Sequence, residues 1–303
     1  MLVTDFEFAG QKASSWGLMP CMFDSSDTAT VSNGSKLTFS TANPANSDTW
    51  YFVGSKYSEV LTGTLQIMKK NCSGKYDDQF FTLDEIRAIS RWLNRKDGYH
   101  RLVLTIEDMP GYEDIWFNAY INVSVIEQVG KVVGLELEIT TDKPYGYFAE
   151  RVAHIELSQD TNMSGTVYDI SDEIGISYPK FIFTVQPISM EHGVFDFNLV
   201  HSWYDENHTL VSKVTTIFFG DMSPWHWHGD YAHYSFVIDS KNRMLYTNDD
   251  IQTPIDPKYF NFEWPTLVNT ATDNMNTFTL TGNFMNYWDV DIISTPVAKV
   301  GLI

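Results

Sequence analysis

Alternating hydrophobic and polar residues dominate the chain and predict a protein built mainly from β-strands. In residues 119–125, four apolar side chains alternate with three polar or aromatic ones, and residues 135–140 repeat the pattern with two glutamates. Successive side chains of a strand point to opposite faces, so this alternation indicates antiparallel strands with one buried and one solvated face. The pattern recurs in the second half of the chain, in residues 181–185, 195–199, 234–238 and 278–284.

One strongly helical segment, residues 82–94, interrupts the β pattern. It begins with a capping box, because the Thr82 oxygen can accept the amide of Glu85 while the Glu85 side chain reaches back. Acidic residues in the first turn and basic residues near the end suit the helix dipole. The apolar residues recur at spacings of three and four, which predicts one face buried against a sheet. That face comprises Leu83, Ile86, Ile89, Trp92 and Leu93.

A break in the alternation at Pro144 and Gly146 divides the chain into two predicted domains. Residues 1–146 contain the helix and form an N-terminal β domain, whereas residues 147–303 show short strands separated by polar turns. The latter pattern is typical of a β-sandwich or jelly roll. Within the first domain, Asn33 and Gly34 predict the tight turn of a hairpin, because Asn-Gly tolerates two positive φ angles.

The composition describes a globular protein with a strong acidic excess. The chain has 39 acidic and 20 basic residues, a net charge of -19, and 20 Phe, 16 Tyr and 9 Trp residues. Such an excess repels a phosphate backbone, so we expect no sequence-specific nucleic-acid binding. No basic segment followed by an apolar run opens the chain, and no 18-residue apolar window occurs. We therefore expect no membrane insertion and no secretory signal.

The two cysteines show no metal or redox pattern. Cys21 and Cys72 lie far apart and neither belongs to a C-x-x-C motif. We expect two reduced thiols and no intrachain disulfide.

Motifs for the common catalytic chemistries do not occur in the sequence. The phosphate-binding loop, the dinucleotide-binding glycine motif, the H-E-x-x-H zinc motif and the G-x-S-x-G motif are all missing. Carboxylates are abundant, but their number singles out no glycosidase pair. We therefore predict no catalytic residues, no cofactor and no enzymatic activity.

A short aromatic segment, Trp225, His226, Trp227 and His228, is the one cluster with candidate binding chemistry. In an extended segment the two histidines point to one side and the two tryptophans to the other. The histidines could ligate a metal with a nearby histidine or aspartate, but two histidines without a fixed third ligand are a weak signal, so we predict no metal site. An interaction loop at a domain end or interface is the favoured interpretation, and a sugar-stacking platform is the alternative.

Several segments, in their order, resemble the distal tail (Dit) proteins of long-tailed bacteriophages. The resemblance covers the first 150 residues approximately and rests on the opening FEFAGQKASSWGL, on the helix that ends in Arg91-Trp92-Leu93 before a basic loop, and on the exit TDKPY. In the second half, NMNTFTLTGNFMNYWDVDI is similar to the closing strands of these proteins, whose C-terminal domain is a galectin-like β-sandwich.

The resemblance implies a structural protein of the virion tail tip that is assembled in the bacterial host cytoplasm. Its N-terminal belt domains would form a homo-hexameric ring that joins the tail tube protein to the tail hub protein. Its C-terminal domains would hold other baseplate parts, such as a receptor-binding protein. The alternative hypothesis is a soluble carbohydrate-binding β-sandwich protein that uses the loop from Trp225 to His228.

Overall fold

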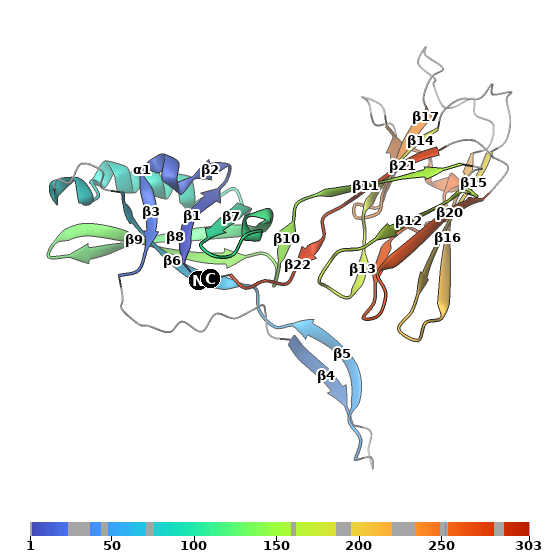
Figure 1. The fold of residues 1–303 in the computed structure, drawn as a ribbon, viewed down its shortest axis with the longest axis horizontal. Helices are drawn as coiled ribbons and strands as arrows, with labels where there is room; N and C mark the ends of the chain where they lie inside the picture. The colour runs from blue at the N-terminus through green and yellow to red at the C-terminus, as the bar shows by residue number, and fades with distance from the viewer. Residues whose placement is uncertain are drawn as a thin grey trace. The chain divides into compact units, whose positions relative to one another are not determined.

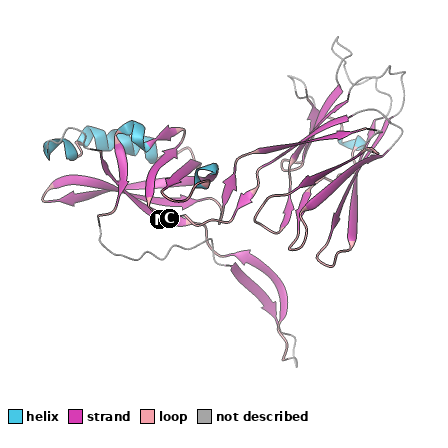
Figure 2. Cartoon of the chain, viewed as in Figure 1, coloured by secondary structure: helices cyan, strands magenta, loops and turns pink. Residues whose placement is uncertain are grey.

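The structure is a computed structural model that describes residues 2–23, 37–43, 48–70, 76–158, 162–185, 195–219, 234–248, 252, 254–281 and 288–302. Strands predominate in these residues, and the α-helix among them lies in the N-terminal half (Figure 2). The sequence-based prediction of a mainly β protein with an amphipathic helix is therefore confirmed.

The chain divides into two compact units. The first unit comprises Met1–Ala149 and Val297–Ile303, and the second comprises Glu150–Pro296. The ranges predicted from sequence, residues 1–146 and 147–303, assign residues 147–149 and 297–303 to the second domain, whereas both segments belong to the first unit. The second unit is thus inserted into the first.

Strand pairing and burial explain this return of the chain. Strand β22 (Val297–Ala298) pairs with β10 (Gly146–Phe148), which also pairs with β8 (Ile115–Gln128). Leu302 is buried in the first core. The Tyr112 hydroxyl, also buried, donates a hydrogen bond to the carbonyl oxygen of Gly301. These contacts attach the C-terminal residues to the first unit.

Gly146, where the sequence pattern predicts a break between domains, is part of strand β10 in the sheet. A Cβ atom at this position would lie 2.8 Å from Cγ2 of Ile115 and 2.9 Å from Cε1 of Phe117. The two strands approach closely here because glycine carries no side chain. The break in hydrophobic alternation therefore marks a tight packing position.

Most strands of the first unit form one large antiparallel sheet (Figure 1). Nine strands of its described residues take part. The main path runs β2-β1-β7-β8-β9-β6-β3, β10 pairs with β8, and β22 pairs with β10. The remaining bounds are β1 (Val3–Phe8), β2 (Gln11–Lys12), β3 (Leu18–Cys21), β6 (Thr62–Lys69), β7 (His100–Ile106) and β9 (Lys131–Thr141). Three short 3-10 helices lie in its described residues: η1 (Ala13–Trp16), η2 (Tyr76–Gln79) and η3 (Tyr112–Asp114).

Helix α1 (Leu83–Leu93) covers part of this sheet, and its predicted capping box is present. The Glu85 amide donates to the Thr82 hydroxyl, and the Thr82 amide donates to the Glu85 carboxylate. Trp92 is buried, its ring is stacked on Phe6, and its indole Nε1 donates to the carbonyl of Phe8 at 3.0 Å. The helix is therefore fixed to the sheet by packing and by a buried hydrogen bond.

The predicted apolar face of α1 is buried only in its later turns. Ile89, Trp92 and Leu93 are buried, and Ile86 packs against the core while remaining partly exposed. Leu83, predicted to share this buried face, is 70% exposed. It is the first helical residue, and contact with the core begins one turn later, at Ile86. Periodicity gives the side of the helix a residue occupies, but not how far along the helix the packing extends.

The second unit is a sandwich of antiparallel sheets with a shared aromatic core. Within its described residues, a five-stranded sheet has the order β11-β21-β14-β17-β18 and a four-stranded sheet the order β12-β20-β15-β16. Phe181 and Phe183 from the first sheet and Phe278 from the second belong to one buried cluster. Alternation predicts this arrangement, because each sheet turns one apolar face inward.

The strands of the second unit have the following bounds: β11 (Arg151–Leu157), β12 (Ser164–Tyr168), β13 (Gly175–Ser177), β14 (Lys180–Val185), β15 (Phe195–Tyr204), β16 (Leu210–Phe219), β17 (Tyr234–Asp239), β18 (Met244–Thr247), β19 (Leu267–Asn269), β20 (Met275–Thr281) and β21 (Trp288–Ser294). Strands β13 and β19 form a separate pair, and η4 (Pro257–Tyr259) is a 3-10 helix. None of the helices in the described part of the chain has the length and hydropathy of a membrane span.

Candidate functional site

An antiparallel ribbon of two strands, β4 (Leu37–Ala42) and β5 (Tyr51–Tyr57), forms a sheet of its own in the first unit (Figure 1). The register pairs Phe39 with Ser55 and Thr41 with Phe52. The predicted turn at Asn33-Gly34 lies outside the described residues, and within the described residues β4 pairs with β5.

The ribbon exposes an unusual amount of apolar surface. Phe39 is 61% exposed and Phe52 is 64% exposed, although the two rings contact each other. Leu37, Tyr51 and Val53 are exposed as well. A two-stranded ribbon without a covering layer is marginally stable in water, and contiguous exposed apolar surface marks an interaction site. The ribbon is therefore a candidate interaction surface.

A second candidate site lies on the outward face of the five-stranded sheet in the second unit. Strands β11 and β21 place His154 directly opposite Asp291 and Glu156 directly opposite Asp289. The residues are two apart on each strand, so all four side chains share one face. The intervening Ile155 and Val290 are buried in the sandwich core. The buried alternation thus fixes the direction of the polar side chains.

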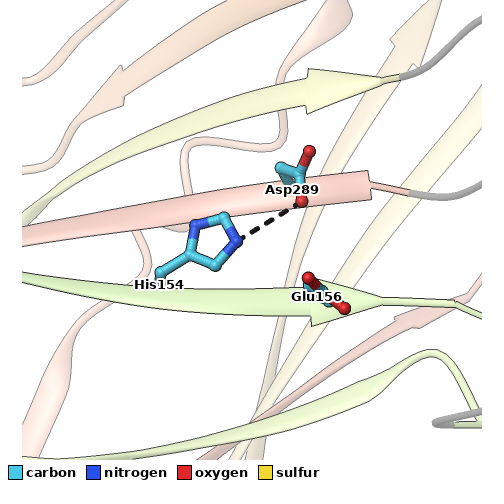
Figure 3. Close-up of side chains that lie close together, drawn as sticks. All are labelled: His154, Glu156 and Asp289. Atoms are coloured by element: carbon cyan, nitrogen blue, oxygen red, sulfur yellow. Dashed lines mark ion pairs between the residues drawn. The ribbon is translucent and has the colours of Figure 1, made fainter.

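His154 lies at the centre of this polar group. Its Nδ1 lies 2.8 Å from a carboxylate oxygen of Asp291, and its Nε2 lies 3.4 Å from a carboxylate oxygen of Asp289 (Figure 3). The hydrogen bond to Asp291, with the charges of Asp291, Asp289 and Glu156, raises the pKa of His154 above its ordinary value. One ligand atom each from His154, Glu156 and Asp289 lies within 4.8 Å of the other two. Among the described residues, no further group of this kind occurs.

His201, a third polar feature, has a structural role in the second core. Its ring is buried and stacked on Phe278, and its Nε2 lies 2.8 Å from the side-chain oxygen of Asn276. The same Asn276 oxygen accepts the amide of Val268. Burial lowers the pKa of His201 to about 4, so the ring is neutral near neutral pH. The contact between His201 and Asn276 links strand β15 to strand β20, and it presents no group to a ligand.

The residues predicted from sequence as a binding loop, Trp225, His226, Trp227 and His228, lie outside the described residues. Cys72 lies outside them too, whereas Cys21 is a free thiol. The helix residues predicted to be structural contribute to the first core, except for Leu83. The predicted interaction loop and its glycan alternative therefore stay predictions.

Sequence analysis misses both candidate sites found in the structure. His154 and Glu156 form an H-x-E pattern, and Asp289 and Asp291 form a D-x-D pattern, but the two are far apart in the sequence. Only the pairing of β11 with β21 brings them together. The ribbon has a visible signal in the run Trp50-Tyr51-Phe52-Val53, which is apolar without alternation.

Comparison with known proteins identifies the type of protein. Residues 1–143 match the family described as phage tail protein N-terminal domain. The crystal structure of Dit (gp 19.1) from phage SPP1 has a TM-score of 0.59 and 13% sequence identity, over 96% of this chain and 98% of that chain. Residues 1–143 thus belong to a phage tail domain family, and the chain as a whole has a Dit-like fold. A search of curated protein sequences finds no match.

The family match and the likeness in fold together support a structural component of a phage tail, located in the virion tail with other tail proteins. SPP1 Dit is described as a paradigm of the hub adsorption apparatus in phages that infect Gram-positive bacteria. The similarity in fold extends over both units of this chain.

Proposed function

We propose that this Dit-like protein forms a hexameric ring at the tail tip, where it connects the tail tube protein to the tail hub protein. The match in fold over 96% of this chain and 98% of SPP1 Dit carries the proposal, because it includes both units. In the ring, the first units make the subunit contacts, and the second units anchor baseplate parts that recognise the host. The ring assembles in the cytoplasm of the bacterial host.

The ribbon of β4 and β5 supports this proposal with a physical argument. Its aromatic side chains are exposed on a pair of strands that no third strand extends in the described structure. Subunits of a ring bury such surfaces against their neighbours, and aromatic residues are enriched at the centres of protein interfaces. We therefore assign the ribbon to the contact between neighbouring subunits.

Native mass spectrometry and light scattering of the purified chain test the ring. We expect hexamers that are lost in the double variant Phe39→Ser/Phe52→Ser. The matched control is Leu83→Ser, which removes an equally exposed apolar side chain from the same unit but outside the ribbon. A ribbon variant that assembles like the parent would remove the ribbon from the interface.

Localisation in the virion tests the remainder of the proposal. Antibody-gold labelling of intact particles should place the protein at the distal end of the tail, between tube and hub. Labelling along the tail shaft, or at the head, would refute a role as the connecting ring. A chain that stays monomeric even with its tube and hub partners would refute the hexamer.

A further inference from the structure

The outward face of β11 and β21 carries a polar group of one histidine and three carboxylates. His154 and Glu156 on one strand lie opposite Asp291 and Asp289 on the other. Strand β11 is at the edge of its sheet, and β21 is its neighbour. We propose that His154, Glu156 and Asp289 bind a divalent transition-metal ion, and that Asp291 orients the imidazole.

The orientation of the imidazole is the first argument. The Nδ1–H group of His154 donates to Asp291 at 2.8 Å, so in the neutral imidazole the lone pair lies on Nε2. Metal-binding histidines are commonly held in this way, with the second ring nitrogen donating to a carboxylate. The other ring nitrogen, Nε2, faces Asp289 (Figure 3).

The distance between the donors is the second argument. Nε2 of His154 and the facing oxygen of Asp289 are 3.4 Å apart, which is long for a hydrogen bond. Two ligands that are each about 2.1 Å from a tetrahedral ion lie roughly 3.4 Å apart. The third donor, Glu156, has a ligand atom within 4.8 Å of both, a distance that side-chain rotation can close. A proton on Nε2 can be shared with one carboxylate at a time, whereas an ion can bind all three donors.

The charge of the group is the third argument. Glu156 and Asp289 are directly opposite each other, and like charges in this position destabilise a strand pair. Asp291 adds a third carboxylate around a single imidazole. A divalent cation offsets this repulsion and connects the edge strand β11 to β21.

The donor set selects the class of ion. One imidazole nitrogen with carboxylate oxygens suits zinc and the neighbouring first-row ions, whereas magnesium and calcium prefer oxygen ligands alone. Three protein ligands leave positions for water, so the ion is held at the surface and is exchangeable. Its role is to stabilise the edge of the second unit.

Calorimetric titration of the full chain with Zn²⁺, after treatment with a chelator, tests the site. We expect one ion per chain at this site, with affinity at least tenfold weaker in His154→Gln and in Asp289→Asn. His100→Gln is the matched control, because His100 pairs with a single carboxylate, Asp97, and should leave binding unchanged. A His154→Gln variant that binds Zn²⁺ as tightly as the parent would overturn the proposal.

A second comparison separates this site from the histidine-rich loop. The double variant His226→Gln/His228→Gln should retain the binding that His154→Gln loses. Binding that disappears only in the loop variant would assign the ion to the loop. Thermal unfolding gives an independent readout, because Zn²⁺ should raise the unfolding temperature of the parent but not of Asp289→Asn. Equal unfolding temperatures with and without Zn²⁺ in the parent would also refute the site.

Discussion

Replacing Trp92 by alanine should weaken the first unit by several kcal/mol. Trp92 is 5% exposed, and its ring is stacked on Phe6, at 5.9 Å, and on Trp16, at 5.1 Å. Truncating a buried aromatic residue of this size costs about 3–5 kcal/mol. The variant also loses the hydrogen bond from Nε1 to the carbonyl of Phe8, and a polar group left buried without a partner costs about 1–3 kcal/mol.

A matched variant in the same helix separates packing from helix propensity. Leu83→Ala shortens an apolar side chain that is 70% exposed, so we expect a change within about 0.5 kcal/mol. Ile89→Asp should be at least as damaging as Trp92→Ala, because it places a charge in the buried face of the helix.

Differential scanning calorimetry can measure these effects unit by unit. The transition of the first unit should move to lower temperature in Trp92→Ala, and that of the second unit should stay in place, because the substitution lies in the first core. If Trp92→Ala and Leu83→Ala melt alike, α1 is not fixed to the sheet as the structure indicates.

Three further predictions concern protonation, thiols and salt. The folded pKa of His201, about 4, is below the unfolded value of 6.5, so its contribution to stability is present above pH 6.5 and is lost as the pH falls toward 4. Urea unfolding of the parent and of His201→Gln across this range should show a pH dependence in the parent that the variant lacks. Thiol titration in denaturant should find two thiols per chain, with Cys21 reacting slowly in the native protein because burial raises its pKa to about 11; a disulfide in fresh protein would contradict this. Six copies of a chain of charge -19 repel one another, and salt screens this repulsion, over about 8 Å at physiological ionic strength. Light scattering should therefore show a larger fraction of assembled ring as the salt concentration rises toward that level. A larger fraction of ring at low salt would contradict this.

Local signals account for the parts of the fold that could be predicted from the sequence. The capping box at Thr82 and Glu85 fixes the start of α1, because both hydrogen bonds join residues close in sequence. The alternation in β8 and β9 identifies their buried faces, since Ile121 and Ile139 are buried and paired in register. Patterns of this kind depend on one segment at a time.

Long-range pairing accounts for the parts that could not be predicted. The proximity of His154 to Asp289 depends on the register of two distant strands. A shift of β11 by one residue would turn His154 to the opposite face from Asp289. The exposure of Leu83 depends on how far the underlying core extends. The return of residues 297–302 to the first sheet depends on a partner strand that hydrophobicity alone does not name.

The insertion of the second unit into the first has a consequence for the timing of synthesis. The first unit starts with the earliest residues of the chain, yet its sheet and core include β22 and Leu302, which are translated after the whole of Glu150–Pro296. At about 5–20 residues per second, the ribosome needs roughly 7–30 s to cross the second unit. During that interval the nascent first unit lacks its last strand, while the complete sequence of the second unit becomes available to fold. A subunit ready for assembly therefore exists only after both units have been made.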